Sequence, residues 1–316
     1  MIKKFTSAFV AKIHQSERTG IYYMLGASFL FALTGLCVRL LKGDIGPIQS
    51  VFFRNVIGFF YIAFSLYITK PVIKGGNKLL LLIFRGIIGT LALYAFFYGV
   101  THIGLGVATT YQQTYPIFLA VLSVILFKEH LLKLEWLGVF IGFIGVAIVF
   151  LPQLLAADLN PRSHIIGLSN AIMTGLAYLS IRGLKDDYDV RVIVLVFMLC
   201  GIFLPLLSML GKPYFPDDSF DFIFENFVVP DLDNYIWILL MGFAALGGQI
   251  CLTKAFLYNK TGLVGAIGYS NILFAVTFGW IIGDPAPEDH VFLGIAIIIF
   301  SGLLISGVFT KKNKTS

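Results

Sequence analysis

The sequence carries little charge for a chain of 316 residues. Only 13% of the residues are Asp, Glu, Lys or Arg, whereas 58% are hydrophobic and the mean hydropathy is +0.89. A water-soluble globule of this length needs a larger share of polar residues to cover its surface. The composition therefore excludes a soluble protein and indicates an integral membrane protein.

Several motifs of catalysis and energy conversion are also missing. The chain contains no G-x-x-x-x-G-K-[ST] loop for ATP, no H-E-x-x-H zinc motif and no G-x-S-x-G nucleophile turn. Its three cysteines, Cys37, Cys200 and Cys251, fall inside apolar runs, where they are expected as buried thiols. We therefore expect no enzyme activity, no cofactor and no metal site.

Long apolar runs are the most abundant feature of the chain. Each run is roughly 18 to 25 residues long, which is enough for a helix to cross a hydrocarbon layer of about 30 Å. The ten runs cover residues 20–41, 47–69, 78–101, 105–127, 134–152, 163–183, 190–210, 235–257, 262–283 and 290–309. The sequence thus predicts an all-α integral membrane protein with ten transmembrane helices.

The chain also repeats itself. The segment Ala95–Tyr98 returns as Ala255–Tyr258, and Gly104–Ala108 returns as Gly262–Ala266, about 155 to 160 residues later. Each copy holds five apolar runs, and an odd number inverts the second copy across the membrane. The predicted organisation is a cytoplasmic or interfacial N-terminal segment 1–19, a first five-helix repeat 20–152, a second five-helix repeat 163–309 and a basic cytoplasmic tail 310–316.

The positive charges predict the orientation of the chain. With the N-terminus inside, fifteen Lys and Arg residues fall on inner segments and three on outer loops. Both termini should then face the cytoplasm, and the short loops favour a bacterial inner membrane. Because the net charge of +6 belongs to the inner surface, we expect membrane lipids and no nucleic acid as partners.

Charged residues inside the predicted spans are all basic. Arg39, Arg182 and Lys254 lie near span ends, where long side chains can reach the headgroups. Arg54 and Arg85 lie about 10 Å inside, where a guanidinium needs backbone carbonyls, water or an anion. We expect at least one of Arg54, Arg85 and Lys254 to bind a carboxylate or phosphate of a transported molecule.

Polar and aromatic residues are concentrated in a few spans. The fourth span opens with the polar block 109–115, which is costly in lipid unless its groups are hydrogen-bonded, and Pro116 predicts a kink there. Hydrogen bonds between helices explain any single one of these residues better, but the group as a whole favours a pathway. The predicted substrate-binding residues are Arg54, Arg85, Tyr94, Tyr98, Tyr111, Gln112, Gln113, Thr114, Tyr178, Gln249, Lys254, Tyr269 and Asn271.

Small residues mark one face of the fifth span. Gly138, Gly142 and Gly145 lie close together there and allow another helix to approach closely. Packing within one chain is the simpler interpretation. The same face would also serve a homodimer, so we expect a monomer with a homodimer as the alternative.

The strongest local motif runs from the fourth span into the fifth. It comprises residues 116–122, 127–129, 136–138 and 142–146, and the second copy has 271–276, 283–284 and 293–294 in its place. Arg54-Asn55 and Phe84-Arg85-Gly86 add to the pattern. On these motifs the chain resembles the drug/metabolite transporter superfamily, and within it the EamA-type ten-span carriers. The resemblance implies inverted five-helix repeats around a central cavity, with the last helix of each repeat at the periphery.

These observations predict a transporter of a small anionic or zwitterionic metabolite, such as an amino-acid or nucleoside-like solute. Acidic residues are absent from the depth of the spans, and the histidines fall in loops or at span edges, so exchange or uniport by alternating access is expected. A lipid flippase or scramblase is the alternative, because a phospholipid headgroup also needs positive charge and a polar groove. A purely structural protein would not need Arg54 and Arg85 at depth.

Overall fold

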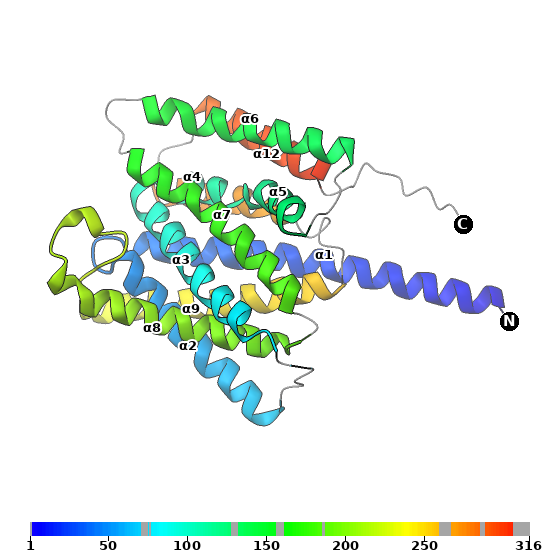
Figure 1. The fold of residues 1–316 in the computed structure, drawn as a ribbon, viewed down its shortest axis with the longest axis horizontal. Helices are drawn as coiled ribbons and strands as arrows, with labels where there is room; N and C mark the ends of the chain where they lie inside the picture. The colour runs from blue at the N-terminus through cyan, green and yellow to red at the C-terminus, as the bar shows by residue number, and fades with distance from the viewer. Residues whose placement is uncertain are drawn as a thin grey trace.

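The computed structural model describes residues 2–70, 75, 77–127, 132–155, 161–184, 187–258, 267–284 and 288–305. In these ranges the chain forms helices and no strand, arranged as a bundle with the longest helices side by side (Figure 1). The repeated segment at 262–266 and the predicted tail 310–316 lie outside the described residues.

Most helices coincide with the apolar runs. They are α1 (Ile2–Leu40), α2 (Pro47–Ile68), α3 (Leu79–Ile103), α4 (Leu105–Gln112), α5 (Tyr115–Phe127), α6 (Lys133–Leu155), α7 (Pro161–Leu184), α8 (Val190–Gly211), α9 (Leu232–Tyr258), α11 (Ser270–Ile281) and α12 (Asp289–Ile305). Six of the described helices are long and apolar enough to cross a membrane, and α11 and α12 are shorter apolar helices. The protein is a multi-pass integral membrane protein.

The first helix continues through the boundary drawn between segment 1–19 and the first span. Helix α1 is one continuous helix of 39 residues. Its N-terminal part projects beyond the bundle (Figure 1). The physical reason is the absence of a helix breaker, since the first glycine of the chain is Gly20 and no proline precedes Pro47.

The fourth span is broken rather than kinked. Helix α4 ends at Gln112, Gln113 and Thr114 form a turn, and α5 begins at Tyr115. Pro116 is the second residue of α5, where its missing N–H costs no hydrogen bond, whereas its ring prevents α4 from continuing through it.

The ninth span has a matching break. The chain is helical at 267–268, turns at Tyr269 and continues as α11. The side-chain amide of Gln113 donates a hydrogen bond to the carbonyl of Gly268, so the two breaks are joined directly. Each break places backbone carbonyls and polar side chains in the middle of the bundle.

Helices from the two halves of the chain pack against one another in matching pairs. Helix α1 packs on α9 as α3 packs on α7, while α2 meets α8 and α6 meets α12. Helices α6 and α12 lie together at one side of the bundle (Figure 1). A Cβ added at Gly142 would collide with Ser301 and Ile117, so the small-residue face is occupied by α12 and not by a second copy of the chain.

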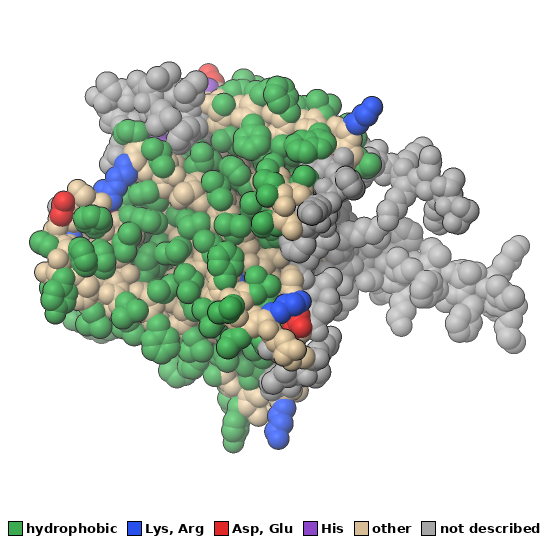
Figure 2. Space-filling view, in the orientation of Figure 1, with side chains coloured by type: hydrophobic (Ala, Val, Ile, Leu, Met, Phe, Trp, Pro, Cys, Tyr) green, Lys and Arg blue, Asp and Glu red, His purple; other side chains and the backbone are tan. Residues whose placement is uncertain are grey.

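The surface is apolar over most of its area. Figure 2 shows hydrophobic side chains over the middle of the visible face and charged ones mainly toward its edges. Large side chains on this kind of surface include Phe60, Leu80 and Leu207, which are 67%, 84% and 64% exposed. In water such exposure would be costly, whereas in a bilayer it is the surface that lipid tails cover.

A loop at 211–231 folds over one end of the bundle, called here the loop end. The carboxylate of Glu225 accepts hydrogen bonds from the backbone N–H groups of Ile48 and Gln49 at the start of α2. The Gln49 side chain in turn bonds Val228 through both its donor and its acceptor atom. The loop is therefore held by defined polar contacts to the bundle.

Arg39 also lies at the loop end, and the expectation that it reaches lipid headgroups is wrong. Its guanidinium forms an ion pair with Asp284 and donates to the carbonyls of Val100 and Thr101. Asp284 accepts a further bond from the Leu105 N–H. The side chain of Arg182 is outside the described part of the structure.

Candidate functional site

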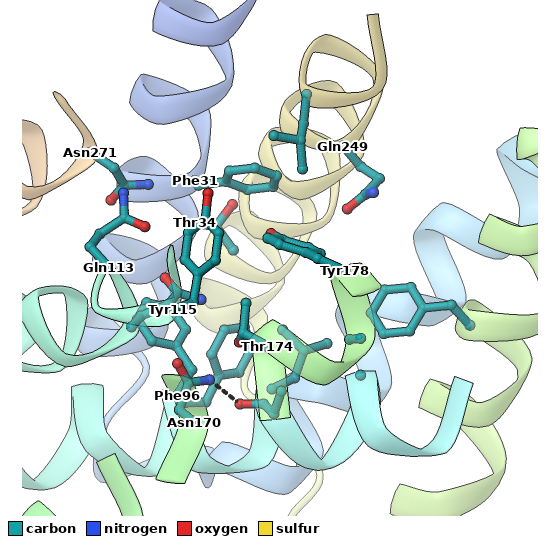
Figure 3. A pocket seen from close by; sticks show the side chains of 18 of the residues that line it. Phe31, Thr34, Phe96, Gln113, Tyr115, Asn170, Thr174, Tyr178, Gln249 and Asn271 are labelled. Atoms are coloured by element: carbon teal, nitrogen blue, oxygen red, sulfur yellow. Dashed lines mark hydrogen bonds between the residues drawn. The ribbon is translucent and has the colours of Figure 1, made fainter. Parts of the chain in front are cut away.

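A cavity of about 100 Å³ lies in the centre of the bundle. Its walls come from α1 to α5, α7 to α9 and α11, and neither α6 nor α12 contributes a lining residue. This agrees with the expectation that the last helix of each half packs at the periphery. The cavity also lies where the two broken spans meet, beside Gln113 and Asn271 (Figure 3).

Two arginines reach this cavity. Arg54 on α2 and Arg85 on α3 are only 6% and 4% exposed. Their guanidinium carbons lie 5.8 and 4.5 Å from the centre of the Phe197 ring on α8, and Arg54 also donates to the Asn55 side chain over 3.3 Å. In the described part of the chain neither arginine is paired with a carboxylate.

Arg85 has unused hydrogen-bond donors. Its Nε and Nη1 atoms are buried and have no hydrogen-bond partner among the residues that the structure describes. Its side chain runs along α3 toward Gly89. A Cβ atom added to that glycine would collide with Arg85 Nη1 and would also touch the ring of Phe197. Glycine is thus required at this position to leave room for the guanidinium.

Helix α7 contributes a polar stripe to the cavity. Asn170, Thr174 and Tyr178 lie four residues apart, so they share one face of the helix. The Asn170 amide nitrogen donates to the Ala92 carbonyl on α3, as the dashed line in Figure 3 marks. That bond fixes the amide and leaves its buried Oδ1 atom without a partner. Oδ1 can therefore only accept a bond from water or a ligand.

Aromatic rings complete the walls of the cavity. Tyr115 and Tyr178 meet edge to face with their centroids 5.0 Å apart, and Phe31 and Phe96 lie nearby (Figure 3). Rings of this kind can stack on a planar solute or lie against a cationic group. The cavity thus combines hydrogen-bond donors, acceptors and apolar faces, as binding sites for small organic molecules do.

Comparison with known proteins gives the family. The model of the EamA-like transporter family matches residues 18–151. An uncharacterized transporter of Helicobacter pylori is 31% identical over 291 residues, a match that covers 91% of this chain and 94% of the relative. The chain belongs to the EamA-like transporter family. It is thus a member of the drug/metabolite transporter superfamily and a membrane transporter, as the sequence motifs predicted.

Two further comparisons support this conclusion. The pseudopaline exporter CntI of Pseudomonas aeruginosa is 24% identical over 93% of this chain and 98% of its own. One solved crystal structure, 16% identical, has a TM-score of 0.60 and covers 95% of this chain and 99% of its own, so it shares the fold. Both matches therefore cover nearly the whole chain.

Seven of the predicted site residues of this EamA-like transporter line the central cavity. They are Arg54, Arg85, Gln112, Gln113, Tyr178, Gln249 and Asn271. Six helices and the turn between α4 and α5 supply them, so side chains that are far apart in the sequence converge on one space. Their role in binding stays a prediction.

Four other predicted residues have partners elsewhere in the bundle. The hydroxyl of Tyr94 bonds Ser208, and that of Tyr98 donates to Asp221 while its ring stacks on His102. Tyr111 and Thr114 complete this group: the Tyr111 hydroxyl bonds the buried His164 ring, and Thr114 donates to the Tyr111 carbonyl. Tyr94 and Tyr111 thus join helices, Tyr98 joins α3 to the loop, Thr114 bonds within its own turn, and none of the four lines the cavity.

The last two predicted residues are also outside the cavity. Lys254 is exposed, and its ammonium lies 5.0 Å from the centre of the Tyr23 ring on α1. Tyr269 is buried against Gly302 of α12, and its hydroxyl has no partner in the described part of the chain. The buried positive charge at the cavity is therefore carried by Arg54 and Arg85.

Sequence reasoning missed several lining residues. Thr34 and Thr174 both line the cavity, and they occupy matching places in the two copies, since each begins the sequence Thr-Gly-Leu. Asn170 and Tyr115 also line the cavity. A sequence signal for them existed, because the matched threonines and the four-residue spacing from Asn170 to Tyr178 mark one face of each helix. No comparable pattern distinguishes the apolar lining residue Phe197 from other phenylalanines.

Proposed function

We propose that this transporter carries a small organic metabolite that is anionic or zwitterionic. The observation that supports this most is the burial of Arg54 and Arg85 beside a cavity without a carboxylate partner in the described structure. Burying an ion costs several kcal/mol even after relaxation, whereas a desolvated cation–π contact returns about 2 kcal/mol. A negative charge on the substrate would supply the difference.

We further propose two inverted five-helix repeats, divided as 20–152 and 163–309, that work by alternating access. The matching helix pairs support this organisation, because α1 on α9 and α3 on α7 exchange under a twofold rotation. The two broken spans that meet at Gln113 and Gly268 support it as well. Discontinuous helices at the interface of inverted repeats are where many secondary carriers bind their substrates.

The proposed movement is exchange or uniport in an inner membrane of a bacterium, with both termini in the cytoplasm. The relative named as an exporter comes from a bacterium and moves its solute out, and we infer a soluble organic solute here as well. A lipid headgroup would also meet the two arginines, so lipids belong among the compounds tested.

Uptake into proteoliposomes tests the proposed function. Preloaded vesicles are challenged with amino acids, organic acids, nucleotides and lipid-headgroup analogues, with and without an imposed pH gradient. We expect counterflow of anionic or zwitterionic solutes, no uphill uptake from the pH gradient alone, and at least a tenfold loss in Arg85→Gln. Equal counterflow by folded Arg85→Gln, or preference for cations, would refute the proposal, and selective movement of lipids would favour the flippase.

Arg85→Lys serves as the matched variant in this assay. It keeps the positive charge but cannot form a two-pronged bond to a carboxylate. An intermediate loss, smaller than that of Arg85→Gln, is expected if the guanidinium contacts the substrate. Thermal unfolding in detergent shows for each variant whether the loss comes from unfolding.

A further inference from the structure

Both buried arginines lie on the same aromatic ring. Because Phe197 is within 6 Å of both guanidinium carbons, the two positive charges occupy one end of the cavity. Like charges this close repel one another unless water or an anion screens them, and a cavity of about 100 Å³ has room for little water. A substrate with a single negative charge would leave one of the two arginines uncompensated.

The other polar end of the cavity offers an acceptor. Asn170 Oδ1 has no partner, and its amide is fixed by the bond to Ala92. The Arg85 guanidinium reaches the level of Gly89, and from Gly89 to Ala92 the helix rises about 4.5 Å. The Asn170 amide is therefore anchored about one helical turn further along α3 than the level that the Arg85 guanidinium reaches.

We propose that the substrate carries two negative charges, held by Arg54 and Arg85, and an N–H or O–H donor about one helical turn away, held by Asn170. The proposal deepens the proposed function and rests on it. The two charges come from a pair of carboxylates or from one phosphate. Amino dicarboxylates and amino-group-bearing phosphate monoesters have this arrangement in a size that suits the cavity.

Matched compounds separate the two parts of the proposal. L-Glutamate and L-glutamine differ in one negative charge at nearly constant shape, and L-glutamate and glutarate differ in the ammonium donor. O-Phosphoethanolamine and ethanolamine test the charge of a phosphate, because both carry the ammonium donor and neither has a carboxylate. Dissociation constants are measured by titration calorimetry on the purified full-length protein in detergent, without phosphate buffer.

The wild-type protein should bind L-glutamate at least tenfold more tightly than L-glutamine and about fivefold more tightly than glutarate. O-Phosphoethanolamine, which has a phosphate and no carboxylate, binding more tightly than L-glutamate would assign the charges to a phosphate, and the reverse to two carboxylates. Arg54→Gln should abolish the preference for L-glutamate over L-glutamine. Asn170→Leu should abolish the preference for L-glutamate over glutarate and leave the affinity for glutarate within twofold.

Arg162→Gln is the control, because it removes an arginine at the loop end, outside the cavity, and should change neither ratio. Equal binding of L-glutamate and L-glutamine together with equal binding of O-phosphoethanolamine and ethanolamine overturns the proposed pair of negative charges. Unchanged ratios in folded Arg54→Gln and Asn170→Leu overturn the assigned residues. Absence of binding by every dianionic compound also overturns the proposal, and the uptake assay with Arg85→Gln then decides separately whether the proposed function stands.

Discussion

Arg85 is positioned by packing rather than by an ionic partner. Its guanidinium fits between the Phe197 ring and the bare backbone of Gly89. Two of its nitrogen atoms, Nε and Nη1, stay free to donate toward the cavity. A small change at Gly89 should therefore act on the site without removing the charge.

Gly89→Ala tests the position of this guanidinium. The new methyl group would collide with Arg85 Nη1 and crowd Phe197, so the flexible arginine end must shift. We expect counterflow to fall about tenfold while the thermal midpoint stays within a few degrees, since Ala favours helix over Gly by about 1 kcal/mol. Gly26→Ala is the control, because its Cβ meets only Cys251 at 3.9 Å. Wild-type counterflow in Gly89→Ala would show that the position of Arg85 does not matter.

Individual residues show where sequence reasoning succeeded. Arg54 and Arg85 were found because a charge deep in an apolar run needs an explanation. Tyr94 does not line the cavity, and helix geometry gives the reason: nine residues after Arg85, at about 100° per residue, it lies on the opposite face of α3. Applying the helical period to each candidate would have removed it and added Asn170.

The broken spans are the elements that bring the site together. Pro116 predicted a kink in the fourth span. In the structure the helix is interrupted instead by a turn at Gln113 and Thr114. The sequence could not show that this turn meets Gly268, because only the folded bundle brings together residues that lie 155 positions apart. The same limit applies to Arg39 and Asp284, which are separated by 245 positions.

The loop at 211–231 is an element with a built-in pH dependence. Burial raises the pKa of Glu225 to about 7 from its usual 4.5, against the opposing effect of the Ile48 and Gln49 N–H groups. The docked loop thus holds a proton more tightly than the undocked loop. Docking should be most stable below pH 4.5 and weaken as the pH rises toward 7.

Hydrogen exchange of residues 220–231, corrected for intrinsic rates, measures this effect. Protection should decrease between pH 4.5 and 7 in the wild type and become independent of pH in Glu225→Gln. Asp231→Asn, a change at an exposed carboxylate in the same loop, should keep the wild-type slope. An unchanged slope in Glu225→Gln would assign the pH dependence to another group.

At the scale of the molecule, contacts between the halves close the loop end. The Arg39–Asp284 ion pair joins α1 to the end of α11, and Asp284 also holds the first N–H of α4. Arg162 at the start of α7 pairs with Asp221 of the loop, which also accepts from Tyr98 of α3. These contacts link α1 and α4 through Asp284, and α3 and α7 through Asp221, at the loop end.

The central claim is that the buried arginines Arg54 and Arg85 bind the negative charge of the substrate. The most direct measurement is anomalous diffraction from crystals grown with selenate, whose selenium marks a doubly charged anion. We predict a selenium peak within hydrogen-bond distance of the free Arg85 nitrogens, beside Phe197, that is absent from Arg85→Gln crystals. Selenium bound only at surface lysines, with the cavity holding water in both proteins, would contradict the account.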